Sequence, residues 1–554
     1  MTPLTYARHM SEAIPGSGAD GSSGGPVVEG PHDPEHDPRA SYVLEPEHVA
    51  RLTARIVATT GTSAQVHSPI NGAPLANIPQ SSTEDVAEAF RRARVAQAAW
   101  ARVSVDERAR ILHRLHDIVL DRQDEIMDLI QLESGKARKH AFDEPLHIAL
   151  TARYYARTAH RHLDTQRRPG VVPVLTRVEL NRVPKGVVGI ISPWNYPFTM
   201  ALCDGLPALL AGNAVVAKPD AQTMLSALLG AQLLEDAGFP RDLWQVVAGP
   251  GRELGTPIIE RSDYICFTGS TATGKIIAKQ AAERLIGCSL ELGGKNPILV
   301  LRDADIERAA EGAVRACFSN AGQLCVSTER MFVADAVYDR FVERFVARTK
   351  AMSLGATMDW DADMGTLISA DQLDTVTAHV DDAVAKGARV LAGGSARPDL
   401  APYYFEPTIL EGVTPEMTCF GNETFGPVVS IYRFHDEADA IARANDGEYG
   451  LNGSVYTRDT ERGRQVARQI KCGTVNVNEA FGATFASIDA PMGGMRESGM
   501  GRRQGAEGIH RYTETQSVAT QRLIRFGPML GMSDEGYAKF MTASLRFMDK
   551  LGRA

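Results

Sequence analysis

Residues 186–218 read GVVGIISPWNYPFTMALCDGLPALLAGNAVVAK, and this stretch decides the fold. Residues 186–192 and 214–218 have the length and apolar character of buried strands, and residues 198–211 have the pattern of a helix. The stretch is apolar enough to be mistaken for a membrane span. Asp204 and three prolines interrupt it, however, so a buried strand, loop and helix fit better. The stretch therefore predicts a strand–helix–strand unit of a parallel sheet.

The same rhythm of short strands and longer helices continues after this unit. It occupies one series up to about residue 290 and a second series from Asn296 to about Asn478. Such alternation predicts an α/β protein with two doubly wound parallel sheets and a cleft between them. The predicted helices are 223–237, a segment after Thr271, 306–318 and 372–386, and the predicted strands are 243–248, 264–268, 331–334 and 474–477.

The segments outside these two series have patterns of their own. Helical periodicity runs from Thr83 to Trp100, from Asp106 to Gly135 and over 145–162. The alternation over 172–183 predicts a β-hairpin able to pair with another subunit. Residues 1–42 are rich in Gly, Ser and Pro, which predicts a disordered tail. Apolar residues at helical spacing after 536 predict a packed terminal helix, with a membrane-surface or partner helix as the alternative.

Composition excludes several classes of protein. The chain has 554 residues, which is too long for one core, and a net charge of −9, which argues against nucleic acid as a partner. No apolar signal segment opens the chain. Its seven cysteines are scattered without a Cys-x-x-Cys pair, so neither a disulfide framework nor a zinc site is expected. These features favour a reducing, cytoplasmic compartment without an integral membrane segment.

Three loops carry groups that suit nucleophilic chemistry. They are 193–197 (PWNYP), 291–295 (ELGGK) and 320–325 (NAGQLC). The Cys325 thiol is a candidate nucleophile, and Glu291, at the end of an apolar run, a base whose pKa burial would raise. Asn195 is a neutral donor suited to an oxyanion. The alternatives are a structural cysteine, a salt bridge from Glu291 to Lys295, and an Asn that caps a helix.

Two glycine-rich segments are weaker signals. Residues 269–275 (GSTATGK) imitate a phosphate-binding P-loop, but Ile276 stands where the metal-binding Ser or Thr belongs. The pair Gly269 and Ser270, between a strand and a helix, still suits anion binding through free N–H groups. Residues 249–255 are one residue too long for a Gly-x-Gly-x-x-Gly motif, so a plain turn explains them equally well.

These motifs, in this order, resemble the aldehyde dehydrogenase superfamily over about residues 50–520. Residues 423–428 (ETFGPV) and 490–499 (APMGGMRESG), continuing to 512–514, fit the same pattern. The chain looks most like bacterial NADP-type succinate-semialdehyde dehydrogenases. The resemblance implies two doubly wound α/β domains plus a β-hairpin oligomerisation arm. The implied division is a tail (1–42), an NAD(P)-binding domain (43–170 and 185–290), a catalytic domain (291–484), the arm (171–184 and 485–521) and a C-terminal helical tail (522–554).

The resemblance also implies a mechanism and a set of cofactor contacts. Cys325 attacks an aldehyde, Asn195 stabilises the oxyanion, hydride leaves to a nicotinamide, and Glu291 activates the water that hydrolyses the thioester. NADP is favoured over NAD because Ala221 stands where NAD-preferring members often carry Glu, although Asp220 lies beside it. No metal is implied. The implied cofactor-binding residues are Trp194, Asn195, Lys218, Pro219, Asp220, Ala221, Gly269, Ser270, Leu292, Glu423 and Phe425.

The implied reaction is oxidation of succinate semialdehyde to succinate in a homodimer or homotetramer. In better-understood members two arginines clamp the substrate carboxylate, and here those positions hold Cys203 and Ser319. A dehydrogenase of neutral or aromatic aldehydes is therefore an alternative. A catalytically silent scaffold is another, which the retained Cys325, Glu291 and Asn195 oppose.

Overall fold

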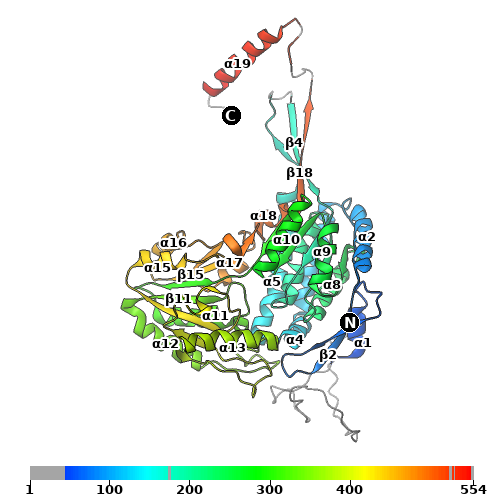
Figure 1. The fold of residues 1–554 in the computed structure, drawn as a ribbon. Coiled ribbons are helices and arrows are strands. Elements are labelled where there is room, and N and C mark those ends of the chain that lie inside the picture. Colours follow the sequence, from blue (N-terminus) through cyan, green and yellow to red (C-terminus); the bar gives the residue numbers. More distant parts are fainter. Residues whose placement is uncertain (1–43, 172–175, 523–526, 530, 551–554) are drawn as a thin grey trace.

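The structure is a computed structural model that describes residues 44–171, 176–522, 527–529 and 531–550. Two α/β units lie side by side, and a narrow arm of strands projects from one of them (Figure 1). The predicted fold class, two doubly wound α/β domains with a β-strand arm, is confirmed. The predicted tail over 1–42 and the first residues of the predicted hairpin, 172–175, lie outside the described residues.

The first unit is built on a six-stranded sheet with the order β17-β9-β8-β5-β6-β7. Five strands run parallel, and the short β17 is antiparallel to β9. The strand–helix–strand unit over 186–218 supplies two adjacent central strands, β5 and β6. The strand bounds are β5 Val187–Ile191, β6 Ala214–Lys218, β7 Trp244–Val246, β8 Tyr264–Thr268, β9 Gly287–Glu291 and β17 Gly499–Met500.

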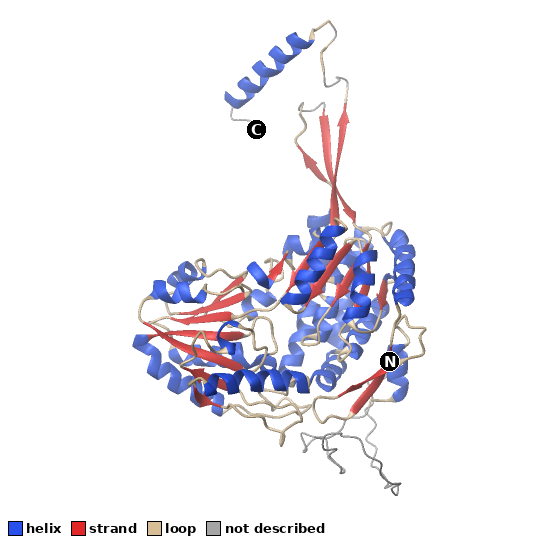
Figure 2. Ribbon diagram, in the orientation of Figure 1, coloured by secondary structure: helices blue, strands red, loops and turns tan. Residues whose placement is uncertain are grey.

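Helices cover this sheet in two groups, which is the arrangement that a doubly wound sheet requires. Within the first group α2 packs on α9 and α9 on α10, and within the second α3, α4, α5, α6 and α8 pack on one another. Figure 2 shows the helices around the strands. The bounds are α2 Thr83–Trp100, α3 Val105–Asp121, α4 Gln123–Ser134, α5 Arg138–Leu163, α6 Pro197–Leu202, α7 Gly205–Leu210, α8 Met224–Ala237, α9 Gly251–Arg261 and α10 Thr271–Glu283.

Two predicted helices are each divided in the structure. The segment from Asp106 to Gly135 breaks at Arg122, between α3 and α4. The segment 198–211 breaks at Cys203 and Asp204, between α6 and α7. Asp204 is buried there and forms ion pairs with two arginines from the C-terminal part of the chain, which explains how a charged residue is tolerated inside an apolar helical pattern.

The second unit contains a seven-stranded sheet with the order β12-β13-β14-β11-β10-β15-β16. All neighbouring pairs are parallel except β12 and β13. The strand bounds are β10 Asn296–Val300, β11 Thr328–Ala334, β12 Arg389–Ala392, β13 Thr408–Glu411, β14 Val428–Phe434, β15 Asn452–Tyr456 and β16 Thr474–Val477. The main helices are α11 Ile306–Phe318, α12 Tyr338–Lys350, α13 Ala370–Ala385, α15 Glu437–Ala444 and α16 Thr460–Ala467.

The arm is a three-stranded antiparallel sheet rather than a simple hairpin. Its central strand β4 (Thr176–Pro184) pairs with β18 (Thr513–Gln521) and with β3 (Gln166–Arg168). The predicted arm bounds need correction, because β17 joins the sheet of the first unit and α18 (Gly505–His510) packs on α5 and α7. Of the segment 485–521, the arm therefore receives only β18.

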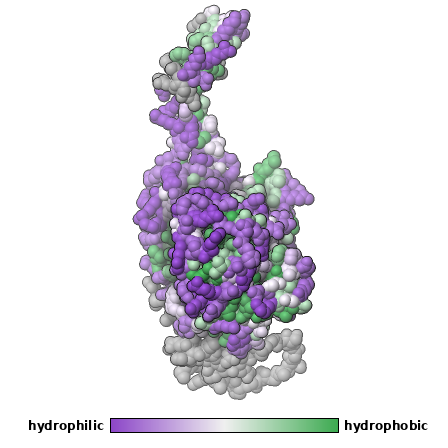
Figure 3. All heavy atoms as spheres, turned by 90° about the vertical axis from the view of Figure 1, so that its left-hand side faces the viewer, coloured by the Kyte–Doolittle hydropathy of each residue, from purple (hydrophilic) through white to green (hydrophobic). Residues whose placement is uncertain are grey.

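The C-terminal helix α19 (Asp534–Lys550) lies beyond the tip of the arm (Figure 1). None of its residues is buried, and Phe540, Leu545 and Phe547 are exposed. The predicted packing of this helix is therefore not seen within the part of the chain that the structure describes. Among the described residues, no helix is both long and apolar enough to cross a bilayer. The face in Figure 3 is mostly hydrophilic, with scattered hydrophobic areas.

Candidate active site

The structure brings together the three residues that the motifs predicted as catalytic. Asn195 lies in the loop between β5 and α6, Glu291 ends β9, and Cys325 precedes β11. The Asn195 side-chain nitrogen donates to the backbone oxygen of Gln323 at 3.0 Å, which ties the first unit to the cysteine loop. Glu291 is close enough that its charge raises the pKa of the Cys325 thiol. The site therefore lies where the two α/β units meet.

The loop before Cys325 has an uncommon backbone. Asn320, Ala321 and Gly322 have φ values of 51°, 53° and 71°, so three successive residues are left-handed. A Cβ at Gly322 would lie 2.0 Å from the backbone oxygen of Gly426, so only glycine fits there. Asn320 holds the loop by donating to the Asn195 backbone oxygen at 3.0 Å. Such a backbone persists only where surrounding contacts determine it, which is common at functional sites.

Burial raises the pKa of the Cys325 thiol to about 12. The Arg503 guanidinium opposes this rise, and the carboxylates of Glu291 and Glu423 contribute to it. The group at rest is therefore a thiol, and it loses its proton only when the surroundings change. The Asn296 side chain donates to the Cys325 backbone oxygen at 2.8 Å, which fixes the main chain of the nucleophile while the sulfur stays free.

Burial raises the pKa of Glu291 to about 7, which suits a general base at neutral pH. Its Oε1 atom is buried and has no hydrogen-bond partner among the described residues. The alternative of a salt bridge to Lys295 is wrong, since Lys295 pairs with Glu329 instead. Glu329 in turn accepts from the backbone nitrogen of Phe425 at 3.0 Å.

A buried ion pair that the motifs did not reveal orients Asn195. The Lys136 ammonium donates to the Asn195 backbone oxygen and to Glu144, each at 2.7 Å. Glu144 also accepts from the backbone nitrogen of Thr199 at 2.9 Å. A lysine directly after Gly135, the left-handed end of α4, was the only visible signal, and it does not reveal its partners.

The predicted anion site at Gly269 and Ser270 lies where β8 ends and α10 begins. Ser270 caps α10 by accepting from the backbone nitrogen of Thr273, and the Gly269 nitrogen donates to the Glu291 backbone oxygen at 3.0 Å. A Cβ at Gly274 would lie 2.5 Å from Leu292, so α10 packs directly on that predicted residue. The partly positive start of α10 therefore lies beside the base.

The P-loop alternative finds no support in the geometry. Its lysine, Lys275, is exposed and forms an ion pair with Glu497 at 2.7 Å, and Ile276 is 58% exposed. Residues 249–255 form the turn into α9. Among the described residues, one group has the composition of a metal site, His113, His116 and Asp117, and it lies on α3, away from the loops above.

The segment 218–221 begins at the last residue of β6, Lys218, which supplies a buried cation. The Lys218 ammonium donates only to the Pro219 backbone oxygen, at 3.3 Å, among the contacts of the described residues. Burial lowers the pKa of Lys218, and Asp220 opposes that effect. One Asp220 oxygen accepts from the backbone nitrogen of Gln222 at 3.0 Å. Ala221 contributes no charge, so Lys218 retains capacity for an anion.

Glu423 and Phe425 lie on the opposite unit, next to the glycines of the Glu291 motif. Glu423 accepts from the Gly294 backbone nitrogen at 2.7 Å, and a Cβ at Gly293 would lie 2.3 Å from its carboxylate. Burial raises the pKa of Glu423 to about 8. Phe425 has a φ of 52°, and its ring meets the ring of Trp194 edge-on with centroids 5.5 Å apart.

Residues 56–518 match the family model described as the aldehyde dehydrogenase family. This chain belongs to that family. It is 52% identical over 506 residues to a Mycolicibacterium smegmatis protein named "Putative succinate-semialdehyde dehydrogenase", of the NADP(+) type, with 91% of this chain and 98% of the relative covered.

Two solved structures are also similar to this chain. One is the crystal structure of an E. coli NADP dependent enzyme, 35% identical, with a TM-score of 0.80 and coverage of 84% of this chain and 96% of that one. The other is an NAD+ complex of a Bacillus cereus aldehyde dehydrogenase, 34% identical, with a TM-score of 0.81 and coverage of 86% and 99%.

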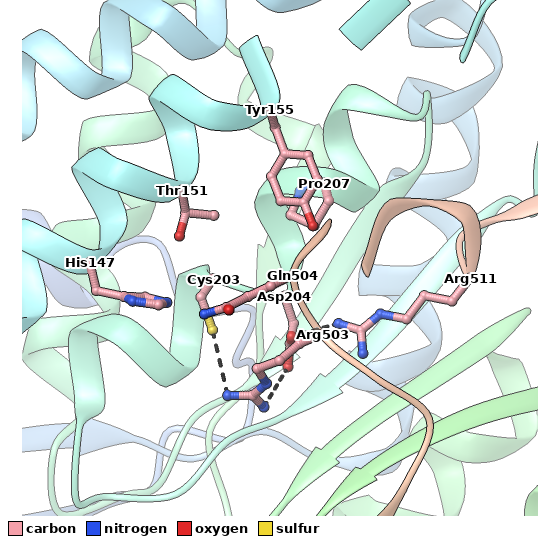
Figure 4. A pocket seen from close by; sticks show the side chains of 9 residues that line it. All are labelled: His147, Thr151, Tyr155, Cys203, Asp204, Pro207, Arg503, Gln504 and Arg511. Atoms are coloured by element: carbon pink, nitrogen blue, oxygen red, sulfur yellow. Dashed lines mark hydrogen bonds and ion pairs between the residues drawn. The ribbon is translucent and has the colours of Figure 1, made fainter. Parts of the chain in front are cut away.

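This aldehyde dehydrogenase has a charged cluster behind its base that the motifs did not predict. The cluster consists of Asp204, Arg503 and Arg511 (Figure 4). The nearest signals were a lone acid in an apolar run and the adjacent Arg502 and Arg503 just past a recognised motif. Cys203, at one of the two positions without the expected arginine, lies 4.0 Å from the Arg503 Nη1 atom.

Proposed function

We propose that this aldehyde dehydrogenase oxidises succinate semialdehyde to succinate through a thioester on Cys325. The observation that carries the proposal is the meeting of a thiol, a carboxyl with a pKa near neutrality and a side-chain amide at one site. The name of the mycobacterial relative supports the choice of aldehyde.

Each of these residues performs one chemical step. The Cys325 thiol gives its proton to solvent water as its sulfur bonds to the aldehyde carbon. Asn195 and the Cys325 backbone N–H donate to the oxyanion, which stabilises the tetrahedral intermediate. Loss of hydride then gives a thioester. Glu291 takes a proton from water, whose oxygen bonds to the thioester carbon, and the carbon–sulfur bond breaks to release the acid and the thiolate.

The cofactor site fits a nicotinamide dinucleotide phosphate. Such a cofactor supplies the acceptor for the hydride. Lys218, with no acidic side chain bound to it, suits an extra phosphate, and Ala221 offers that phosphate no repulsion. The start of α10 at Gly269 and Ser270 suits the linking phosphates, and Glu423 suits a ribose hydroxyl. NADP is therefore favoured, and NAD is the alternative.

The positions of the two expected arginines argue against an anionic substrate, but a nearby arginine supports one. Cys203 and Ser319, the positions of the expected arginines, are both buried, and the Ser319 hydroxyl donates to a backbone oxygen at 2.7 Å. Arg503, however, places a cation beside Cys203. Neutral or aromatic aldehydes remain the second candidate, because Asp204 already neutralises part of that charge.

The test is the initial rate of NAD and NADP reduction with succinate semialdehyde and with neutral aliphatic and aromatic aldehydes. Preference for succinate semialdehyde with NADP, together with loss of turnover in Cys325→Ala, supports the proposal. Preference for neutral aldehydes would replace the substrate. Full turnover in Cys325→Ala would refute the mechanism, and inactivity with every aldehyde would favour the scaffold alternative.

We also propose that the chain forms a homodimer or homotetramer through its arm, in the cytoplasm. Eight residues of β18 are exposed, and among the described strands β18 pairs with β4 alone, so its other edge suits a second copy. All seven cysteines are free thiols, as in a reducing compartment. Light scattering of the full chain tests the assembly, and the mass of a monomer at micromolar concentration would contradict it.

A further inference from the structure

Glu291 and Arg503 face each other without a hydrogen bond. The Glu291 Oε1 atom and the Arg503 Nε atom are 3.7 Å apart. Both atoms are buried, and neither has a hydrogen-bond partner among the residues that the structure describes. Leaving a buried polar atom without a partner is costly, so a pair of such atoms at this distance points to a bond that forms in another state of the site.

The remaining nitrogens of Arg503 hold the guanidinium in place. Nη2 pairs with Asp204 at 3.2 Å and donates to the Thr268 hydroxyl at 3.1 Å. The other oxygen of Asp204 pairs with Arg511 at 2.6 Å. Figure 4 shows Asp204 between the two arginines. Because these contacts use one side of the guanidinium, Nε is left to face Glu291.

A small cavity lies against this cluster. The centre of a water molecule can occupy a volume of about 10 Å³ inside it. That is room for one water. Its lining includes His147, Thr151 and Gln504, each of which has a buried polar atom without a partner among the described residues. Burial also lowers the pKa of His147 to about 3, so this imidazole is neutral and does not compete for the carboxylates.

The charges around Glu291 have opposing effects. Arg503, Arg511 and Arg502 favour its ionised form, with Arg503 the strongest of the three, and Asp204 disfavours it. The Cys325 thiol is the other titratable group that interacts with it. Since Arg502 bonds to the backbone oxygens of Gly494 and Gly501, it is not bonded to the base.

We propose that Arg503 is a positioning residue for the base, whose Nε–H binds Glu291 Oε1 when that carboxylate is ionised, while Asp204 holds the guanidinium in the required orientation. The proposal rests on the proposed role of Glu291 in hydrolysing the thioester. The bond stabilises the carboxylate before it accepts a proton from water. It also favours loss of that proton afterwards, which returns the base to its starting state.

The experiment follows hydrolysis of an acyl group on Cys325 without cofactor or aldehyde. The full chain is acylated with 4-nitrophenyl acetate, an activated ester that gives the same kind of thioester and releases 4-nitrophenolate. Intact mass then reports the loss of the acetyl group between pH 5.5 and 9. The variants are Arg503→Gln, Arg503→Lys, Asp204→Asn and, as the matched control, Arg502→Gln.

The expected shifts differ in sign. The acid limb is the pH range in which deacylation slows as the pH falls. In Arg503→Gln this limb moves to higher pH by about one unit, because the Glu291 carboxylate loses its nearest cation. Asp204→Asn moves the limb downward, because the Asn oxygen can still accept from Arg503 while the negative charge that disfavours ionised Glu291 is removed. Arg503→Lys, which keeps the charge without the Nε–H, gives a smaller upward shift than Arg503→Gln. Arg502→Gln leaves the limb within a few tenths of a unit of the unmodified chain, as its greater exposure predicts.

An unchanged limb in folded Arg503→Gln, or equal shifts from Arg503→Gln and Arg502→Gln, overturns the proposal. If Arg503→Gln does not fold, Arg503→Lys and Asp204→Asn decide it, since damage to the fold would not shift the limb in opposite directions. Failure with succinate semialdehyde would refute the proposed substrate alone, because the ester assay needs neither that aldehyde nor NADP. Failure of Glu291→Gln to slow deacetylation would refute the role of the base itself.

Discussion

The Asn195 side chain donates to the backbone oxygen of Gln323 at 3.0 Å, two positions before Cys325. This bond joins a loop of the first α/β unit to the loop before Cys325 in the second. The backbone oxygen of Asn195 receives further bonds from Lys136 and Asn320. Asn195, the proposed oxyanion donor, is therefore held at both its side chain and its main chain, so its position does not depend on the substrate.

Replacing Asn195 with alanine is expected to lower kcat by about 10²–10³, the usual effect of losing one oxyanion donor. KM should change much less, because the donor acts on charge that develops only in the transition state. Steady-state kinetics with the best aldehyde measures both constants. A rise in KM at unchanged kcat would assign Asn195 to substrate binding instead.

Glu291→Gln is expected to separate the two halves of the reaction. Cys325 still acylates, so each active site gives one burst of reduced cofactor, but the thioester accumulates because no base activates water. In the unmodified chain, deacylation should fall as the pH drops through about 7, since the carboxylate is protonated below its raised pKa. Stopped-flow absorbance at 340 nm reports the burst, and a variant that turns over normally would exclude Glu291 as the base.

Two glycine-to-alanine changes should have opposite effects on stability. Gly322→Ala places a methyl group against the Gly426 backbone at a left-handed position, which should destabilise the protein by about 1–3 kcal/mol. Gly255→Ala, inside α9 with no atom within 4 Å of the added carbon, should stabilise it by about 0.5–1 kcal/mol. Urea denaturation of both variants checks the pair, and equal midpoints would contradict the described loop geometry.

Cofactor preference should respond to two positions, Lys218 at the end of β6 and Ala221 just beyond it. Lys218→Ala is expected to raise the KM for NADP about tenfold, which corresponds to about 1.4 kcal/mol, and to raise the KM for NAD less. Ala221→Glu should move preference toward NAD, because a carboxylate there repels a 2′-phosphate and can accept from ribose hydroxyls. Parallel titrations with the two cofactors measure the ratio, and equal losses for both would remove Lys218 from phosphate recognition.

Local sequence patterns were sufficient to predict the helices and strands whose ends do not depend on contacts with distant residues. The bounds of α11 and β16 agree with the sequence, because each has an unbroken pattern and a distinct end. The helix over 198–211 was wrong as one piece, since it breaks at Cys203 and Asp204, and the buried Asp204 pairs with Arg503 and Arg511, far along the chain. Partners so distant leave no local trace.

The residues of the candidate site also divide into those that a local motif predicts and those that depend on distant contacts. Cys325, Glu291 and Asn195 stand in short motifs, and the structure brings them together. Lys136 and Arg503 act through contacts between separate segments, which no spacing in one segment encodes. The terminal helix α19 shows the converse, because its apolar spacing was visible although none of its residues is buried within the described part of the chain.

The strand β17 gives the molecule an inserted topology. Gly499 pairs with Glu291 across the antiparallel ladder between β17 and β9, so the main chain departs for the second unit and returns from it at facing positions of one sheet. Facing Cα atoms in such a ladder are only about 5 Å apart. The whole second unit is thus an insertion into the first, with its two ends next to each other, and a short linker from 291 to 499 could replace it. The two crossings of the main chain between the units therefore lie side by side at the residue proposed to activate water.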